Sequence, residues 1–231
     1  MAFLGKVYFR IMPDFILESR FFHLVMFKCL IGKWFDVDFR DKYENFDQGD
    51  WERIYDELFV NRIREDDLTD SQKKRISQNI SGATVLDVGC GSGTLVEFLS
   101  NDKTGLKKIV GTDISGEAIE HAKRNFGNDR VDFEKISIEE MTDDYKSRFD
   151  TVICTHVLEH IIDVDAAIKS LLNIANERLI VIVPDEVEHK YTPAYHVHFF
   201  NKDNPLSKLL DQYEYSENIV DGDFLYVINK K

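Results

Sequence analysis

The segment VLDVGCGSGTL, residues 85–95, constrains the fold more than any other part of this chain. A short apolar run ends in an acid, and Gly89, Gly91 and Gly93 follow at every second position. Glycine lets the backbone take a positive φ and approach a ligand closely. Because open α/β sheets bind ligands where such a loop joins a strand to a helix, we expect a nucleotide-like ligand here.

Strand-like and helix-like segments alternate from residue 84 onward, which predicts a doubly wound, mostly parallel α/β sheet. The predicted strands are 84–88, 107–113, 131–136, 149–154, 178–184, 215–220 and 223–229. The predicted helices are 94–100, 115–127, 163–177 and 201–213. Asp221-Gly222 separates the last two strands and predicts a hairpin, so the seven-stranded sheet should end in an antiparallel pair.

Bulk composition narrows the class of protein. The net charge of -13 argues against a nucleic-acid surface. No segment reaches the ~18 uncharged apolar residues of a membrane span. The three cysteines are widely spaced and indicate no disulfide framework, which favours a cytoplasmic location. Oligomeric state is left open by the sequence.

The glycine loop does not match the common dinucleotide or phosphate motifs. In a G-x-G-x-x-G pattern the third glycine would fall on Thr94, and no Lys-Ser/Thr pair follows for a P-loop. A carboxylate at Asp87 would repel a pyrophosphate but would suit a cationic ligand. Asp113 ends the second predicted strand twenty positions after Gly93, and an acid at that spacing binds ribose hydroxyls in nucleotide folds.

These residues resemble motif I and motif II of class I S-adenosylmethionine-dependent methyltransferases, whose fold is Rossmann-like. The resemblance implies that the glycine loop and Asp87 hold the methionine end of the cofactor, and that Asp113 holds its ribose. Ser137 stands where this family often has Asp, next to an apolar Ile138 expected on the adenine. The cofactor residues that we expect are Asp87, Gly89, Cys90, Gly91, Gly93, Asp113, Ile114, Ser137, Ile138 and Thr155.

The string CTHVLEH follows the fourth predicted strand. Its H-x-x-E-H pattern places His156 and His160 four residues apart, on one face if the segment is helical, where both can bind one metal. The same string is a zinc-peptidase signature, an alternative that leaves Asp113 and the glycine loop unexplained. The position is where the resemblance places the acceptor pocket, and many small-molecule members have a similar VLEH.

Three uses of these histidines stay open: a structural role, general base catalysis, and binding of a metal. Some ubiquinone-pathway and small-RNA methyltransferases look similar, with E-x-x-E-H followed by a later H-x-H-F string. The catalytic candidates are His160, His198 and Glu159, with metal binding undecided. His156 departs from that pattern, and imidazole-rich ligation would favour Zn²⁺-like ions over Mg²⁺.

The irregular segment 184–200 interrupts the chain after the fifth parallel strand and reads as a substrate loop. We expect its polar tips to face the acceptor while its phenylalanines anchor it in the core. The tips are Tyr191, Tyr195, His196 and His198, and the anchors are Phe199 and Phe200.

Residues 1–50 are expected to form a separate aromatic-rich segment before a methyltransferase domain at 51–231. Residues 50–80 predict one or two helices, the second with Thr69 or Asp70 as its N-cap. Residues 1–35 hold seven Phe and a net charge of +3, which leaves -16 for the remainder. The segment reads as a helical cap over the cofactor or as a membrane-surface element. It does not resemble a signal peptide.

The resulting hypothesis is an enzyme that transfers a methyl group from S-adenosyl-L-methionine to an oxygen or nitrogen of a small-molecule acceptor, lipid-linked or sugar-linked. The alternative is a methyltransferase-like protein that binds the cofactor without turnover. No nucleic-acid partner is expected, and residues 1–35 are the expected site of any peripheral membrane contact.

Overall fold

The computed structural model describes residues 12–31, 38–60, 68–103, 105–141, 143–191 and 195–230.

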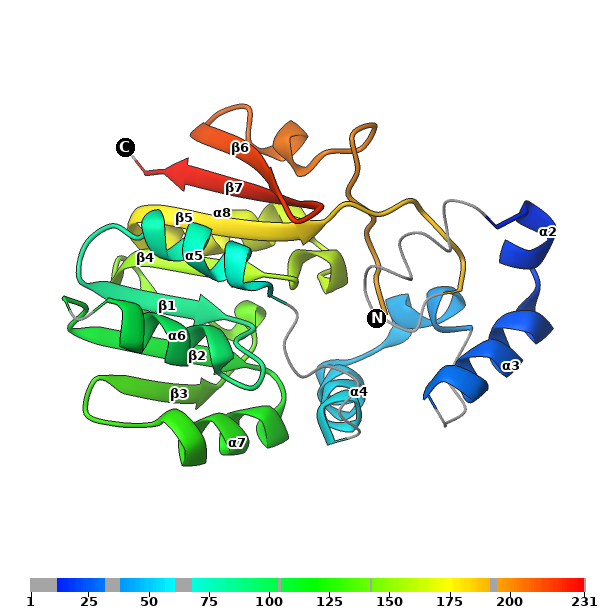
Figure 1. Cartoon of the computed structure of the whole chain (residues 1–231), viewed down its shortest axis with the longest axis horizontal. Coiled ribbons are helices and arrows are strands. Elements are labelled where there is room, and N and C mark those ends of the chain that lie inside the picture. Colours follow the sequence, from blue (N-terminus) through cyan, green and yellow to red (C-terminus); the bar gives the residue numbers. More distant parts are fainter. Residues whose placement is uncertain are drawn as a thin grey trace.

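A seven-stranded sheet with the order β3-β2-β1-β4-β5-β7-β6 carries the α/β part of the molecule (Figure 1). The first five strands along the chain are parallel, and β7 is antiparallel to both β5 and β6. The strands are β1 (Thr84–Val88), β2 (Lys108–Asp113), β3 (Val131–Lys135), β4 (Phe149–Thr155), β5 (Ala175–Pro184), β6 (Glu214–Val220) and β7 (Asp223–Asn229). The predicted fold class and its terminal antiparallel hairpin are confirmed.

Helices cover both faces of the sheet, because alternate residues of the central strands belong to two different apolar cores. Val85 and Ile153 lie in the core that includes residues of α5 (Asp70–Gln78), α6 (Thr94–Asp102) and α7 (Gly116–Phe126). Leu86 and Val152 lie in the core that includes α8 (Val164–Ile174). Continuous apolar strands are what a parallel sheet buried on both faces requires.

The strand order reverses between β1 and β4, which lie side by side although two other strands separate them in the sequence. In open α/β sheets this reversal leaves a crevice at the carboxyl ends of the strands. The glycine loop follows β1, and the CTHVLEH segment follows β4. The topology therefore brings the two motifs to the same edge of the sheet.

The helix α5 begins at a capping box, as the sequence predicts. The Thr69 side chain accepts a hydrogen bond from the Gln72 backbone N–H, and the Gln72 side chain accepts one from the Thr69 backbone N–H. The reciprocal pair satisfies two amide groups that would otherwise have no partner at the start of the helix.

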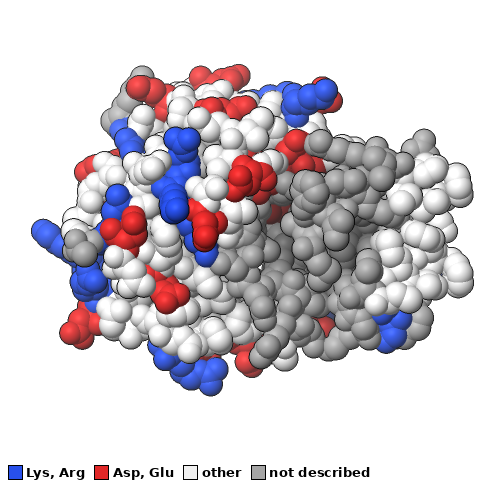
Figure 2. All heavy atoms as spheres, in the orientation of Figure 1, with Lys and Arg blue, Asp and Glu red and all other residues white. Residues whose placement is uncertain are grey.

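The amino-terminal elements lie beyond the carboxyl edge of the sheet (Figure 1). They are α2 (Asp14–Leu17), α3 (Arg20–Ile31), two 3-10 turns (Phe39–Asp41 and Tyr43–Asn45) and α4 (Gln48–Val60). The domain boundary expected at residue 50 falls inside α4, and parts of the predicted 1–35 segment lie outside the described residues. Figure 2 shows that the described surface at the α2–α3 end is mostly uncharged, with one basic patch at its lower edge.

Phe39 ties these elements to the loop that follows β5. Its side chain is 1% exposed, and its ring contacts those of Tyr43, Phe46, Trp51 and Tyr195.

None of the helices in the described parts of the chain has the length and apolarity that a bilayer crossing requires.

The helix predicted over residues 201–213 is wrong. The structure has a single 3-10 turn, Leu206–Leu209, in its place. The Asn201 side chain accepts hydrogen bonds from the backbone N–H groups of Asp203 and Asn204, which holds the backbone in a turn. Pro205 is the N-cap of the 3-10 turn. Because proline has no backbone N–H, it cannot donate the hydrogen bond that would continue a helix from residues 201–204.

Candidate functional site

The glycine loop turns sharply under a cavity at the carboxyl ends of β1 and β4. Gly89, Gly91 and Gly93 all have positive φ, between 51° and 84°. A Cβ at position 89 would lie 2.2 Å from the Val157 Cγ2, so the segment after β4 packs directly on the loop. A Cβ at position 91 would meet nothing within 4 Å, which leaves open space above the backbone there. A ligand can therefore approach this part of the loop closely.

Two carboxylates support the loop from below. Asp113 accepts hydrogen bonds from the Gly91 N–H at 2.9 Å and from the Ser115 N–H at 2.8 Å. Asp87 is 1% exposed, and its Oδ1 has no hydrogen-bond partner among the described residues. Burial, and then the charge of Asp113, raise the pKa of Asp87 to about 7. Such a group gains most from a positively charged ligand.

The cavity has a volume of about 730 Å³. Among the residues predicted to bind the cofactor or catalyse, those that line it are Asp87, Gly89, Cys90, Gly91, Asp113, Ile114, Ser137, Ile138, Thr155 and His160. Gly93 lies just behind the wall, where a Cβ would be 3.0 Å from Ala122 and Phe133. Ser137 is the N-cap of a 3-10 turn, Ile138–Glu140, so its hydroxyl accepts the Glu140 N–H.

The helix α4 forms the wall opposite the sheet, whereas the sequence suggested a helical cap from the residues before it. Four apolar and aromatic side chains of α4 line the cavity: Trp51, Tyr55, Leu58 and Phe59. Asp56 holds the helix in place, since its Oδ1 accepts the Ser115 hydroxyl at 2.6 Å and the Glu117 N–H at 3.2 Å. The aromatic residues four positions apart, Trp51, Tyr55 and Phe59, were the available signal for a covering helix.

The H-x-x-E-H segment is not an α-helix, so the expectation of two histidines on one helical face is wrong. His156 has a positive φ of 54°, and only a 3-10 turn, Leu158–His160, follows it. Backbone of this kind cannot form the metal-binding helix of a zinc peptidase. A positive φ in a non-glycine residue is a strained conformation that is common at functional sites.

Three other side chains form a cluster beside this 3-10 turn. Glu159, His160 and His196 each offer a ligand atom, and these three atoms lie within 4.8 Å of one another. The His160 Nδ1 lies 3.1 Å from the Tyr195 carbonyl oxygen, and the His196 Nδ1 lies 2.6 Å from the Glu186 Oε2. An acceptor at Nδ1 places the proton there and the lone pair on Nε2. His196 was expected at the acceptor, but not as the partner of His160.

This cluster has the donors that a transition metal requires. The Glu159 carboxylate is 1% exposed, and both its oxygens are buried without a hydrogen bond from the described residues. The His156 Nδ1 lies 3.5 Å from its Oε1. A buried carboxylate beside two imidazoles, each oriented by a second group, fits a Zn²⁺-like ion better than Mg²⁺.

His198 does not join this cluster. Its Nε2 lies 3.1 Å from the Ile162 carbonyl oxygen, and it is not among the described residues that line the cavity. Tyr191 packs instead on His23 of α3, with ring centroids 5.0 Å apart. Phe199 and Phe200 are each 5% exposed, so the predicted anchoring of this loop is confirmed.

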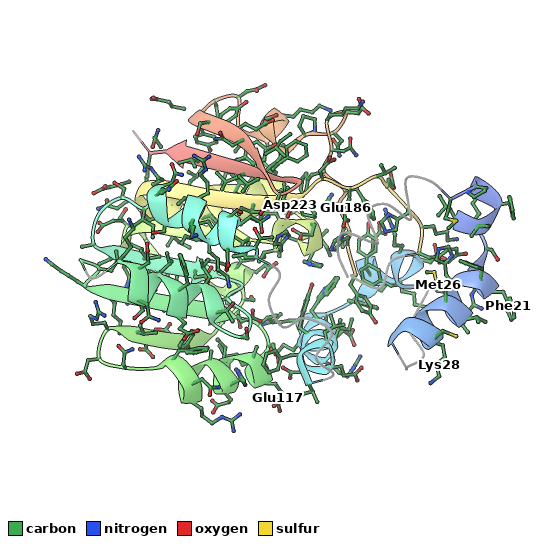
Figure 3. All side chains as sticks on the ribbon, in the orientation of Figure 1. Phe21, Met26, Lys28, Glu117, Glu186 and Asp223 are labelled. Atoms are coloured by element: carbon green, nitrogen blue, oxygen red, sulfur yellow. The ribbon has the colours of Figure 1, made fainter. Side chains whose placement is uncertain are left out.

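His156 joins the site to the hairpin at the far end of the chain. Its Nε2 lies 3.5 Å from the Asp223 Oδ2, and the Gln72 side chain donates to the same oxygen at 2.7 Å. Asp223 opens β7 and pairs with Pro184 of β5, two residues before Glu186. Figure 3 labels Asp223 at the start of β7 and Glu186 in the segment after β5. Neither acid carried a signal in the sequence.

Comparisons with known proteins agree with this geometry. A family model described as a methyltransferase domain matches residues 79–223. The ubiquinone biosynthesis O-methyltransferase of Psychrobacter cryohalolentis is 36% identical over 109 residues, which cover 44% of this chain and 41% of that protein. The mitochondrial enzyme of the same name from Bos taurus is 29% identical over 150 residues, covering 62% of this chain and 37% of that protein. The chain thus spans less than half the length of these two relatives.

Solved structures agree at the level of the fold. Magnesium protoporphyrin IX methyltransferase from Synechocystis PCC 6803, with bound S-adenosylmethionine, superposes with a TM-score of 0.50. The match covers 94% of each chain at 19% identity. The family resemblance predicted from the motifs is confirmed by the family match.

Proposed function

Because the chain belongs to the methyltransferase domain family, we propose that it transfers a methyl group from S-adenosylmethionine to an oxygen or nitrogen of a small-molecule acceptor. The observation that carries this proposal is the pairing of an open glycine loop with the buried acid Asp87 under a cavity of about 730 Å³. The two relatives named above are O-methyltransferases by name, which supports the same reaction.

The cofactor supplies an activated methyl group on a sulfonium, so the protein has to bind, orient and exclude water. Asp87 would stabilise the positive charge at the methionine end of the cofactor. Its pKa is raised by burial and by the charge of Asp113, so an added cation would favour the ionised carboxylate. Asp113 would accept the ribose hydroxyls, while Ile114 and Ile138 would flank the adenine. Trp51 and Tyr55 of α4 would then cover the ligand and keep water from the transferred methyl.

Transfer to a hydroxyl also requires the loss of a proton. His160 lines the cavity and is oriented by the Tyr195 carbonyl, so its Nε2 lone pair is the candidate proton acceptor. Glu159 and His196 lie directly behind it. An ion held by these three residues would instead act as a Lewis acid that lowers the pKa of the acceptor hydroxyl.

We also propose that the acceptor is apolar and lipid-linked. The cavity is walled by aromatic side chains of α4 on one side and by Ile161 and Ile162 on the other. The two O-methyltransferase relatives belong by name to ubiquinone biosynthesis, which supports the same class. An acceptor of this kind resides in a membrane, so the enzyme would meet it at a bilayer surface.

The experiment is a turnover assay with S-adenosylmethionine and phenols that carry or lack an alkyl chain, with S-adenosylhomocysteine as the measured product. The proposal predicts product with at least one phenol and a preference for the alkylated ones. Cofactor binding without product from any phenol or amine would favour the alternative, a methyltransferase-like protein that does not turn over.

The histidines can be separated in the same assay. His196→Ala should reduce turnover by about 10²-fold, whereas His198→Ala, the matched control two residues away, should have little effect.

A chelator should abolish turnover, and added Zn²⁺ should restore it, if the cluster binds an ion. Chelator-insensitive turnover that falls below about pH 6.5 would indicate a histidine base. If His198→Ala is the damaging change, the acceptor lies on the other side of the loop.

A further inference from the structure

The outer side of α2 and α3 exposes a group of large apolar side chains. Phe15 is 75% exposed and Phe21 is 78% exposed, with Phe22 and Val25 beside them at 38% and 40%. Phe21 and Val25 are one helical turn apart and therefore share a face of α3. Figure 3 shows Phe21 pointing away from the rest of the molecule. This group is called the apolar face below.

The opposite side of α3 is firmly anchored, so the apolar face is held in a fixed direction. His23 is fully buried, with its Nδ1 3.0 Å from the Ser19 carbonyl oxygen and its ring against Tyr191. The Arg20 guanidinium donates to both oxygens of Asp38, the nearer at 2.6 Å. Because these contacts hold the inner side, the phenylalanines have to remain outside.

The distribution of charge indicates what covers the apolar face. Residues 1–35 carry a net charge of +3, while the remainder of the chain carries -16. An anionic surface would attract the amino-terminal segment and repel the rest of the chain, which favours approach by the segment that contains α2 and α3. Figure 2 shows charged side chains crowding the opposite end of the molecule, whereas the described surface at the α2–α3 end is mostly uncharged apart from a basic patch at its lower edge.

We propose that the apolar face docks on the surface of an anionic lipid bilayer. Its aromatic side chains would enter the boundary between headgroups and acyl chains, with Lys28 in the last turn of α3 near the lipid phosphates. A second copy of the chain fits less well, because a symmetric pairing would bring two segments of charge +3 together. The proposal goes beyond methyl transfer, since it concerns where the enzyme works.

Docking there would also place the acceptor side of the enzyme near the membrane. The His23 ring contacts Tyr191, which lies in the same loop as Tyr195 and His196. Arg40, which follows α3, donates to the His189 carbonyl oxygen and pairs with Glu188 of that loop at 3.1 Å. The apolar face is thus joined to the loop that orients His160.

The test is co-sedimentation of the full chain with vesicles, with and without about one third phosphatidylglycerol in phosphatidylcholine. We expect pelleting with the anionic vesicles at about 50 mM NaCl and much less at about 500 mM. The variant Phe21→Glu/Val25→Glu should lose about tenfold in the bound-to-free ratio. Ile219→Glu is the matched control, since Ile219 is 68% exposed on the edge strand β6.

Melting temperature and binding of S-adenosylhomocysteine would be measured for each variant, to show that the fold is intact. Three results would overturn the proposal: no pelleting of the wild type, equal pelleting of the double variant, or equal loss in Ile219→Glu. A wild-type dimer in solution that Phe21→Glu/Val25→Glu turns into a monomer would assign the apolar face to a second copy. None of these outcomes depends on turnover, so failure here would leave the proposed reaction untouched.

Discussion

Asp87 shows at the scale of a single residue how the sequence prepares a site for a cation. It is an acid inside a strand that is otherwise apolar, at 1% exposure, and its nearest charged influence is another acid. A structural carboxylate would have a cation or several N–H donors around it. The Asp87 Oδ1 has no hydrogen-bond partner among the described residues, and burial, followed by the charge of Asp113, raises the pKa of Asp87 to about 7.

The raised pKa of Asp87 leads to a pH dependence of cofactor binding. The ligand-free protein holds a proton on Asp87 below about pH 7, whereas the cationic cofactor favours the ionised form. Affinity for S-adenosylmethionine should therefore increase from pH 6 to pH 8 with a midpoint near 7, and level off above it. Titration calorimetry across this range measures the change.

Asp87→Asn removes the titrating group and is the control. It should bind the cofactor about tenfold more weakly at pH 8 and with little dependence on pH. An unchanged pH profile in Asp87→Asn would show that another group is responsible.

Local sequence singled out the glycine loop and, on the acceptor side, Glu159 and His160, but it did not show which later histidine lies beside His160. The loop residues adjoin one another in the chain, and glycine has a distinct backbone chemistry that can be recognised without a structure. His196 and His198 lie in an irregular loop without periodicity, so nothing in the sequence decides which of them faces His160. The choice depends on the positive φ of Tyr195, 58°, and on the pairing of His196 with Glu186.

At the scale of elements, α4 matters most for the site. The sequence predicted a helix in this region, but it could not show that the helix would lie across the cavity, because that placement depends on contacts with α7. Asp56 accepts hydrogen bonds from the Ser115 hydroxyl and the Glu117 N–H at the start of α7, and the Phe59 ring contacts that of His121 in the same helix. The Asp56 carboxylate thus joins α4 to the turn that begins α7.

Asp56→Ala should remove that attachment. The loss of a helix-capping contact costs ~1 kcal/mol of unfolding free energy, which corresponds to a decrease of about 2–4 °C in melting temperature. Affinity for S-adenosylhomocysteine should fall as well, because α4 lines the cavity. Val60→Ala, at a side chain of the same helix that is 61% exposed, is the control and should change neither quantity. Equal effects of both variants would mean that Asp56 has no special role.

For the whole molecule, the fold was predictable because hydrophobic alternation and turn residues recur along 150 residues of chain. The exception, residues 201–213, failed where side chains of Asn201 and its neighbours compete with helical hydrogen bonds. The predicted cofactor residues could also be recognised, because they lie in short continuous segments of the sequence. The network of His156, Asp223 and Gln72 was not, since its members are separated by up to 151 positions.

Cofactor binding should stabilise the whole molecule. S-adenosylhomocysteine at about one hundred times its Kd adds ~2.7 kcal/mol to the native state, or about 5–10 °C in melting temperature. NAD should give no such increase, since the loop lacks the dinucleotide pattern. Asp113→Ala should reduce the increase strongly. An equal increase in that variant would remove Asp113 from the cofactor site, and a larger increase with NAD would contradict the cofactor assignment.

The position of β7 has a consequence for how the protein is made. This strand comes last of the seven in the chain, yet it lies between β5 and β6 and begins at Asp223, beside His156 and Gln72. On a ribosome, the other six strands emerge before the one that completes this edge of the site. Until β7 pairs, β5 presents a bare edge that is open to association with other chains. The nascent chain should therefore be most prone to misassociation in the interval before β7 has emerged and paired with β5.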